Sequence, residues 1–412
     1  MDYQLLFQQK LTQLKEEGNY RYFLTVNKSA RHFPYFYFDQ EGSRQRAINF
    51  CSNDYLGMST DEDVIGKLSY VLHESGTGSG GTRNLSGTTN HHLYLENTIR
   101  QWHQKEAALV FSGAYLANLT ALQTMGRQLR DLIFISDERN HASLIEGMRS
   151  AGNEKHIFRH NDIKHLHEIL QSLPQEKPRM IVFESVYSMN GSIAPVKEII
   201  SLAKHYNAFT YIDEVHAVGL YGSTGAGICE QENILQEVDV INGTLAKAVG
   251  VLGGYITASQ TLIDFIRSFG SGFIFTSSLP PALCAAAAKS IERIKENSLP
   301  RNQMNDLVIY MRHLLNEHGI RYTKNDSHIT PIVIADGAKC KTIADALLWK
   351  HGVYVQPVNY PTVPRGEACL RIIVTARHTI KQVEYLVTCL NKVLNENSAH
   401  YLQAQPSQFV AS

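Results

Sequence analysis

The pattern of apolar and polar positions predicts alternating strands and helices over residues 91–290. Short apolar runs that read as strands lie at 107–111, 132–136, 155–158, 180–184, 209–213, 238–242 and 254–258. Segments with the helical spacing of apolar residues lie at 116–126, 143–151, 162–172, 195–206 and 259–269. This alternation is typical of a mostly parallel, seven-stranded sheet covered by helices on both faces. The sequence therefore predicts an α/β fold whose ligands bind at the carboxyl ends of the strands.

The same pattern predicts how the chain is divided. Residues 1–50 read as an amphipathic helix at 3–17, a polar and aromatic arm and a short strand near 47–50. Residues 51–290 form the predicted large domain, and a long helix at 282–296 leads out of it. Residues 291–396 read as a smaller α+β domain with strands at 331–334, 353–356 and 369–374 and a final helix. Residues 397–412, rich in Ser, Gln and Ala, read as a flexible tail.

Composition narrows the classes of function. The 412 residues include 39 Lys and Arg against 39 Asp and Glu, so no net basic charge indicates a nucleic acid or a membrane as partner. The six cysteines are scattered without a Cys-x-x-Cys pair, which favours free thiols in a reducing compartment over disulfides or a metal site. The first residues resemble neither a signal peptide nor a transit segment. We therefore expect a cytoplasmic enzyme without a bound metal.

Lys247 and Asp213 together suggest the chemistry. Each follows a predicted strand, so both are expected at the edge of the sheet where ligands bind. A lysine there can form a Schiff base with an aldehyde, and a buried aspartate can hold a proton on a heterocyclic nitrogen. Pyridoxal phosphate requires both groups. His216, three residues after Asp213, is placed to contact the same cofactor.

Other polar segments are candidate ligand contacts, although each is also typical of an ordinary turn or cap. The glycine-rich loop at 76–84 allows a close approach of the backbone to a ligand. Residues 112–115 lie between a predicted strand and a predicted helix, where helix amides can bind a phosphate. Thr244, Thr276 and Ser277 carry hydroxyls near predicted loop tips. His141 has an imidazole that could stack on a planar ring.

Seven segments resemble the α-oxoamine synthases, which are fold-type I pyridoxal phosphate-dependent transferases, and the resemblance covers nearly the whole chain. They are residues 51–57 (CSNDYLG), 78–84 (GSGGTRN), 140–147 (NHASLIEG), 183–188 (FESVYS), 213–219 (DEVHAVG), 272–276 (GFIFT) and 354–365 (YVQPVNYPTVPR). The last segment is most similar to the branch that condenses glycine with succinyl-CoA to give 5-aminolevulinate, CoA and carbon dioxide. The resemblance thus implies an acyltransferase of heme and other tetrapyrrole biosynthesis, acting as a homodimer with shared active sites.

The resemblance also implies roles for individual residues. Lys247 would carry the cofactor and act as the base on glycine, Asp213 would pair with the ring nitrogen, His141 would stack on the ring, and His216 and Ser188 would approach its phenolic oxygen. The remaining cofactor contacts would be Ser112, Gly113, Ala114, Tyr115 and Thr244, with Thr276 and Ser277 arriving from the partner subunit. Substrate contacts would be Arg371 and Asn53 for glycine, Arg21, Thr82 and Asn84 for the succinyl carboxylate, Ser136 and Lys155 for the acyl-CoA, and Thr362 in the loop at 354–365.

Two positions and one segment depart from the family pattern. Ala246 stands where the family usually has glycine, Asn190 where it has an acid, and residues 372–378 replace a proline-containing run. These changes are expected to affect turnover and carboxylate binding. Three alternatives stay open: a related synthase with another amino acid or acyl-CoA, the same reaction in a specialised pathway, or a non-catalytic regulatory homologue.

Overall fold

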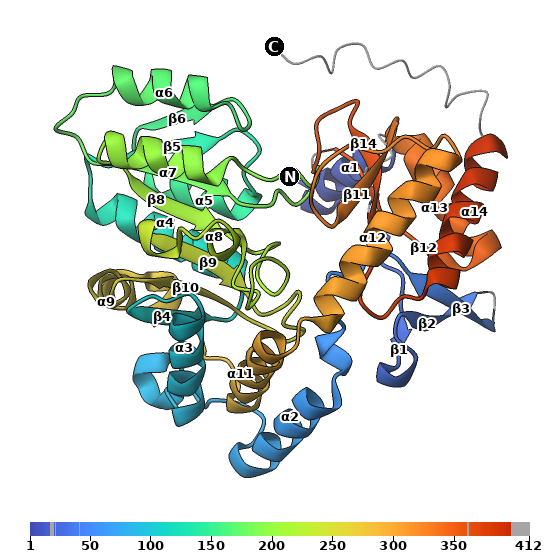
Figure 1. Cartoon of the computed structure of the whole chain (residues 1–412), viewed down its shortest axis with the longest axis horizontal. Helices are drawn as coiled ribbons and strands as arrows, with labels where there is room; N and C mark the ends of the chain where they lie inside the picture. Colours follow the sequence, from blue (N-terminus) through green and yellow to red (C-terminus); the bar gives the residue numbers. More distant parts are fainter. Residues whose placement is uncertain (17–19, 21, 41, 361, 397–412) are drawn as a thin grey trace. The chain divides into compact units, whose positions relative to one another are not determined.

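The computed structural model describes residues 1–16, 20, 22–40, 42–360 and 362–396, and its Cα atoms group into two compact units (Figure 1). The large unit comprises residues 53–188 and 192–302. The small unit comprises the described parts of residues 1–52, 189–191 and 303–412. The N-terminal segment thus groups with the C-terminal part of the chain, and residues 291–302 group with the large unit. The predicted tail at 397–412 lies outside the described residues.

The large unit contains the expected seven-stranded sheet, in the order β4-β10-β9-β8-β7-β5-β6 (Figure 1). All neighbouring pairs from β9 to β6 are parallel, and β10 pairs antiparallel with both β4 and β9. The fold is therefore mostly parallel, as predicted. The strands are β4 (Ala107–Phe111), β5 (Ile133–Asp137), β6 (Lys155–Phe158), β7 (Arg179–Glu184), β8 (Phe209–Asp213), β9 (Val240–Thr244) and β10 (Gly254–Ala258).

Helices of the large unit cover both faces of this sheet. Alternate strand residues, among them Val182 and Tyr211, share one apolar core with α4, α5 and α9. The residues between them, such as Ile181 and Ile212, are also buried and point to the opposite face, because successive side chains of a strand alternate. The helices are α2 (Glu62–Ser75), α3 (Asn90–Trp102), α4 (Ala114–Gln128), α5 (Ala142–Ala151), α6 (Ile163–Ser172), α7 (Val196–His205), α8 (Ile228–Gln231), α9 (Gln260–Phe269), α10 (Ser271–Ile274) and α11 (Pro281–Glu296).

The small unit combines two small sheets with helices. The first has the order β1-β2-β3-β12 and the second β11-β14-β13. The predicted aromatic arm contains an unexpected strand, β2, which pairs antiparallel with β3. The elements are α1 (Tyr3–Glu16), β1 (Asn27–Lys28), β2 (Tyr35–Gln40), β3 (Ser43–Asn49), β11 (Ile329–Ala335), α13 (Gly337–His351), β12 (Val353–Tyr354), β13 (Pro357–Val358), β14 (Ala368–Ile373) and α14 (Ile380–Glu396); α12 (Leu299–Glu317) begins in the large unit's range.

Helix α1 buries none of its residues, although its apolar residues have helical spacing. Its large apolar side chains, including Tyr3 at 63% and Phe7 at 59% exposure, are open to solvent in a single chain. All six cysteines are free thiols, as predicted. Within the described residues, no helix has the length and apolar character required to cross a bilayer.

Candidate active site

Lys247 lies in a tight turn that follows β9. The amide of Leu245 donates to the Gly253 carbonyl over 2.9 Å, and the amide of Gly250 donates to the carbonyl of Lys247 over 2.8 Å. Gly250 has a φ of +73°, and a Cβ there would lie 2.3 Å from the amide nitrogen of Ser59. Glycine is therefore required at 250, and the turn fixes a half-buried Lys247 at the carboxyl end of β9.

A chain of hydrogen bonds holds the amine of Lys247. Its Nζ lies 2.7 Å from His216 Nε2, and His216 Nδ1 lies 2.7 Å from the hydroxyl of Tyr55. The Tyr55 hydroxyl donates to Oδ1 of Asn53 over 3.2 Å. Because that proton is committed to Asn53, Nδ1–H of His216 donates to Tyr55, which leaves Nε2 as the acceptor for Lys247. The imidazole of His216 thus orients the lysine amine.

The carboxylate of Asp213 is buried at the end of β8 and is also fixed by donors. Asn118 Nδ2 on α4 donates to Oδ2 over 2.7 Å, and the amide of Val215 donates to Oδ1 over 2.8 Å. Asn118 is held in turn by the hydroxyl of Tyr211 and by Ser143. Burial raises the pKa of Asp213, whereas these two donors and the nearby charges of His141 and Lys247 lower it. A cation against this carboxyl would favour its ionised form.

A second buried carboxyl, Glu184, lies beside Asp213. The two residues are register partners on the adjacent strands β7 and β8, and Glu184 is 3% exposed. The backbone of His141 hydrogen-bonds to it, yet Oε1 has no partner among the described residues. Burial, and then the neighbouring Asp213, raise the pKa of Glu184 well above its usual value. Both effects favour the protonated form of Glu184, whereas the donors to Asp213 favour the ionised form of that carboxyl.

His141 begins helix α5 close to these carboxyls. Its Nδ1 accepts from the amide of Ser143 and lies 2.8 Å from the Ser143 hydroxyl, so the ring carries its proton on Nε2. Partial desolvation lowers the pKa of His141, and the charge of Asp213 acts in the opposite direction. The ring is exposed and lies edge-on to Tyr115, with their centroids 6.2 Å apart. A planar ligand could therefore stack on a neutral imidazole.

The N-terminus of α4 fits an anion. Gly113 is the N-cap and no side chain caps this end, so the first amides of the helix are available to a ligand. A Cβ at Gly254 would lie 2.1 Å from the amide nitrogen of Ala114, which shows how closely β10 packs against this loop. The structure thus places the predicted residues 112–115 at a suitable phosphate site. Thr244, also predicted for the phosphate, is buried, donates to the carbonyl of Gly253 and accepts from the amide of Ala246.

The glycine-rich loop pairs with the segment that contains Thr276 and Ser277. Thr82 and Ser277 form an isolated antiparallel bridge, and the amide of Ser278 donates to the Gly81 carbonyl over 3.0 Å. The hydroxyl of Thr82 donates to Oδ1 of Asn84 over 2.6 Å. A Cβ at Gly81 would lie 2.3 Å from the carbonyl oxygen of Leu85, so the loop depends on glycine there. Two separately predicted segments therefore form one feature.

The other predicted residues of the large unit have mixed environments. Ser188 is 7% exposed and follows β7, whereas Lys155 is exposed on β6. Ser136 is 3% exposed, and its hydroxyl donates to the Asp137 carbonyl and accepts from Asn140. Ala246, which departs from the family pattern, is exposed. Contacts of these residues with acyl-CoA or cofactor stay predictions.

The small unit holds the remaining predicted residues. Arg371 lies on β14 and is 8% exposed, while Thr362 is exposed. The unusual segment after Arg371 is part of the fold, since His378 is buried, stacks on Phe50 at 4.3 Å and bonds to Thr375 through Nδ1. Asn190 groups with this unit. Arg21 lies outside the described residues.

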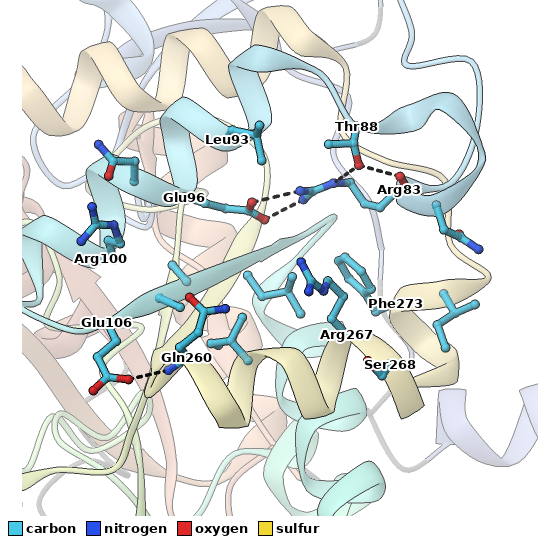
Figure 2. Close-up of a pocket in the computed structure, with 17 residues that line it drawn as sticks. Arg83, Thr88, Leu93, Glu96, Arg100, Glu106, Gln260, Arg267, Ser268 and Phe273 are labelled. Atoms are coloured by element: carbon cyan, nitrogen blue, oxygen red, sulfur yellow. Dashed lines mark hydrogen bonds and ion pairs between the residues drawn. The ribbon is translucent and has the colours of Figure 1, made fainter.

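A separate cavity of about 590 Å³ lies between the glycine-rich loop and α3, α9 and β4 of the large unit (Figure 2). Figure 2 shows Arg83 and Glu96 facing each other across its rim, joined by two hydrogen bonds of 2.6 and 2.9 Å. Of the predicted site residues, Asn84 alone lines this cavity. The cavity is thus distinct from the group formed by Lys247, Asp213 and His216.

Sequence reasoning missed two residues that hold the site, Tyr55 and Asn118. Tyr55 belongs to the family-like segment 51–57, but its hydrogen-bond partner His216 is 161 positions away. Asn118 is a buried polar residue in α4, whose other buried residues are mostly apolar. A fully buried asparagine requires partners, so its position in α4 was the available signal.

These residues fit pyridoxal phosphate. The large unit supplies a half-buried amine, a buried carboxylate with defined donors, an exposed neutral imidazole and an uncapped helix N-terminus. Those are the groups that the aldehyde, the ring nitrogen, the ring face and the phosphate of this cofactor require.

Comparisons with known proteins agree with this arrangement. Residues 45–390 match the family model of class I and II aminotransferases. The chain is 45% identical to the 5-aminolevulinate synthase of Rhizobium meliloti over 393 residues, covering 95% of this chain and 97% of that one. It is also 45% identical to the 5-aminolevulinate synthase of Paracoccus denitrificans, covering 96% of this chain and 98% of that one.

Solved structures resemble the whole fold. A serine palmitoyltransferase from S. paucimobilis, solved with bound PLP and myriocin, has a TM-score of 0.88 at 28% identity and covers 97% of this chain and 100% of that one. An 8-amino-7-oxononanoate synthase from Francisella tularensis has a TM-score of 0.73 at 21% identity, covering 85% of this chain and 99% of that one, and supports the fold alone. The chain belongs to the class I and II aminotransferase family and, within it, to the 5-aminolevulinate synthase family.

Proposed function

We propose that this chain condenses glycine with succinyl-CoA to give 5-aminolevulinate, CoA and carbon dioxide, and that Lys247, Asp213, His216 and His141 form its catalytic set. The observation that carries the reaction is the 45% identity to 5-aminolevulinate synthases over nearly the full length of both chains. Identity to the serine palmitoyltransferase is lower, at 28%, which favours the first reaction over the second. The product is the precursor of heme and other tetrapyrroles.

Pyridoxal phosphate supplies an aldehyde for the amino group and a cationic ring that withdraws electrons from the α-carbon. Lys247 would hold the aldehyde, and Asp213 would keep the proton on the ring nitrogen. His141 would cover one face of the ring. The amides of residues 114–116, with Ser112 and Thr244, would bind the phosphate. Ser188 would donate to the phenolic oxygen, and His216 would approach it.

Proton transfer at the α-carbon of glycine is assigned to Nζ of Lys247. The contact of Lys247 with His216, and of His216 with Tyr55, supports this role because both keep the amine pointed in one direction. A base within hydrogen-bonding reach of its proton contributes about 10² to 10⁴ in rate. Burial and the neighbouring Asp213 favour the protonated form of Glu184, which suits a site for a single cationic ring.

Substrate carboxylates would be bound by arginines. Arg371 and Asn53 are proposed to bind the carboxylate of glycine. Arg21, with Thr82 and Asn84, is proposed for the distal carboxylate of the succinyl group. Guanidinium matches a carboxylate with two parallel hydrogen bonds, so it selects succinyl over an uncharged acyl chain. Ser136, Lys155 and Thr362 are the proposed contacts for the rest of the acyl-CoA.

We also propose a cytoplasmic homodimer whose subunits share active sites. Phe275, next to Thr276, is 80% exposed, and Leu85 in the adjoining loop is 68% exposed. Exposed apolar groups of this size favour a protein partner. The apolar residues of α1 are exposed as well. A second copy covering Phe275 and Leu85 would bury them and would bring Thr276 and Ser277 of the partner subunit to the phosphate.

A mass-resolved product assay tests the reaction. Purified enzyme with pyridoxal phosphate and glycine is offered succinyl-, butyryl- and octanoyl-CoA, and the succinyl donor should give the dominant product. Arg21→Leu should raise the KM for succinyl-CoA by an amount equivalent to about 2–5 kcal/mol and improve the relative use of butyryl-CoA. Arg31→Leu, another arginine of the N-terminal segment, serves as the control. Preferential use of octanoyl-CoA, or of serine in place of glycine, would contradict the proposal.

A further inference from the structure

Asp137, His160 and Ser192 of the large unit contact one another beyond the ends of three strands. Nδ1 of His160 lies 2.9 Å from Oδ1 of Asp137, and Nε2 lies 2.7 Å from the hydroxyl of Ser192. Asp137 ends β5, His160 follows β6 and Ser192 follows β7. These strands are neighbours in the sheet, so the contacts join three adjacent loops at the edge that carries the candidate active site.

The direction of these hydrogen bonds follows from Asp137. Its side chain is fully buried, and the amides of Arg139 and Asn161 donate to its two oxygens over 2.8 and 3.0 Å. Asp137 therefore accepts from Nδ1–H of His160. In the neutral form of the ring, Nε2 then accepts from the hydroxyl of Ser192. The carboxylate of Asp137 thus orients the imidazole of His160, and the imidazole in turn holds the hydroxyl of Ser192.

Ser192 belongs to a hairpin, residues 185–194, that also contains Ser188. The amide of Tyr187 donates to the Ser192 carbonyl over 3.0 Å, and the amide of Ala194 donates to the Ser185 carbonyl over 2.9 Å. Asn161, next to His160, donates its side-chain amide to the Ile193 carbonyl over 3.2 Å. The loop after β6 therefore holds one arm of the hairpin at two successive residues.

The hairpin also packs against the imidazole. The rings of His160 and Tyr187 meet edge to face, with centroids 4.4 Å apart and an interplanar angle of 90°. Tyr187 is 2% exposed and directly precedes Ser188. His160 thus contacts both arms of the hairpin, one through Ser192 and the other through Tyr187. A movement of the His160 ring would therefore displace Tyr187, the residue directly before Ser188.

We propose that His160, oriented by Asp137, is a positioning residue that fixes the hairpin at 185–194 and thereby sets the hydrogen bond from Ser188 to the cofactor. This inference rests on the proposed role of Ser188. Serine hydrolases use the same order of acid, imidazole and hydroxyl. In the α/β-hydrolases the serine lies at a sharp strand-to-helix turn, whereas Ser192 is paired within a hairpin, so the geometry here points to a tether.

The variants separate the two hydrogen bonds of His160. His160→Asn keeps an amide at the position of Nδ1 for Asp137 and removes the acceptor for Ser192. Ser192→Ala removes the donor alone, and Ser192→Thr restores a hydroxyl. His156→Asn is the matched control, because His156 lies on the preceding strand and bonds to Glu154 at the surface.

Two measurements are made on each holoenzyme. Without acyl-CoA, the pH midpoint of the cofactor's visible absorbance reports the hydrogen bond to the phenolic oxygen. With both substrates, kcat and the KM for glycine are determined. We expect His160→Asn and Ser192→Ala to move the absorbance midpoint in the same direction, to lower kcat about three- to tenfold as for one lost hydrogen bond, and to leave the KM for glycine within about twofold. The double variant should resemble either single variant, and Ser192→Thr and His156→Asn should resemble wild type.

An unchanged absorbance midpoint and kcat in Ser192→Ala would overturn the proposal, and so would equal effects of Ser192→Ala and Ser192→Thr. If His160→Asn does not fold, the two Ser192 variants decide the question. The absorbance is measured without acyl-CoA, so an error in the assigned acyl donor leaves this test intact. Ser188→Ala tests the underlying role separately, because a normal absorbance midpoint in that variant removes Ser188 itself from the cofactor.

Discussion

The side-chain amide of Asn118 donates to the buried carboxylate of Asp213 over 2.7 Å, from helix α4 to the end of strand β8. Tyr211, two residues before Asp213, donates its hydroxyl to the other end of the same amide over 2.8 Å. The amide is thus locked with its donor toward the carboxylate. This arrangement explains how a carboxyl whose pKa burial raises can still serve as an anion for a cationic ring.

Replacing Asn118 by Leu should weaken cofactor binding and lower kcat. The loss of a hydrogen bond to a charged group costs about 1.5–3 kcal/mol, which corresponds to roughly 10- to 150-fold. Tyr211→Phe leaves the Asn118–Asp213 bond in place and should have a smaller effect. The Kd for pyridoxal phosphate and kcat are measured for both variants. Equal losses in the two, or no loss in Asn118→Leu, would show that Asn118 does not support Asp213.

Glu184 should make the cofactor-free protein less stable as the pH rises. Folding raises the pKa of Glu184 above its unfolded value, which is near the ordinary 4.5. At pH values between these two pKa values, the native state therefore binds more protons than the unfolded state. The stabilisation from the protonated carboxyl is complete below the unfolded pKa and is lost as the pH rises through the folded pKa. The pKa of Asp213 is also raised in the fold, so this residue contributes to the pH dependence in the same direction.

Glu184→Gln keeps an acceptor for the backbone of His141 but cannot ionise. Its free energy of unfolding should therefore depend less on pH than that of wild type, with the advantage of the variant growing toward alkaline pH. Urea unfolding at a series of pH values measures both proteins without cofactor. Parallel pH profiles of the two proteins would refute a raised pKa of Glu184.

The sequence predicted the large sheet well because most of its strands are buried and read as continuous apolar runs, with β6 as the exposed exception. Strands β4, β6, β8 and β10 agree with the predicted ranges, whereas β9 begins at Val240, two residues after the predicted start. Local sequence could not place that boundary, since it depends on Thr210 in another strand, whose hydroxyl accepts from the amide of Asp239. Strand β2 was missed because its aromatic residues form a hairpin with β3, outside the βα repeat.

The same limit applies to the site. Lys247, Asp213 and His216 could be predicted from their place after strands, and the structure couples them through hydrogen bonds and charge. Tyr55 and Asn118 act through partners 161 and 95 positions away, which no local pattern encodes. The roles of Arg21 and Arg371 in substrate binding came from family resemblance alone and stay predictions.

Complementation between subunits tests the shared site. Lys247→Ala and Thr276→Ala subunits are each expected to form poorly active homodimers. If Thr276 serves the partner subunit's phosphate, each mixed dimer contains one intact site and activity returns. Tagged mixed dimers are purified and assayed against both parents. Activity that stays at the level of the parents in verified mixed dimers would place Thr276 within its own subunit's site or outside any site.

The most direct test of the central claim, that Lys247 carries pyridoxal phosphate at the active site, is borohydride reduction of the holoenzyme followed by peptide mapping. Reduction converts the bond between cofactor and lysine into a stable secondary amine, so a pyridoxyl group should be found on Lys247. Lys247→Ala should show no such label and should lose turnover by about 10² to 10⁴ or more, since it lacks both the attachment point and the proposed base. A pyridoxyl group on another lysine, with Lys247 unmodified, would contradict the account.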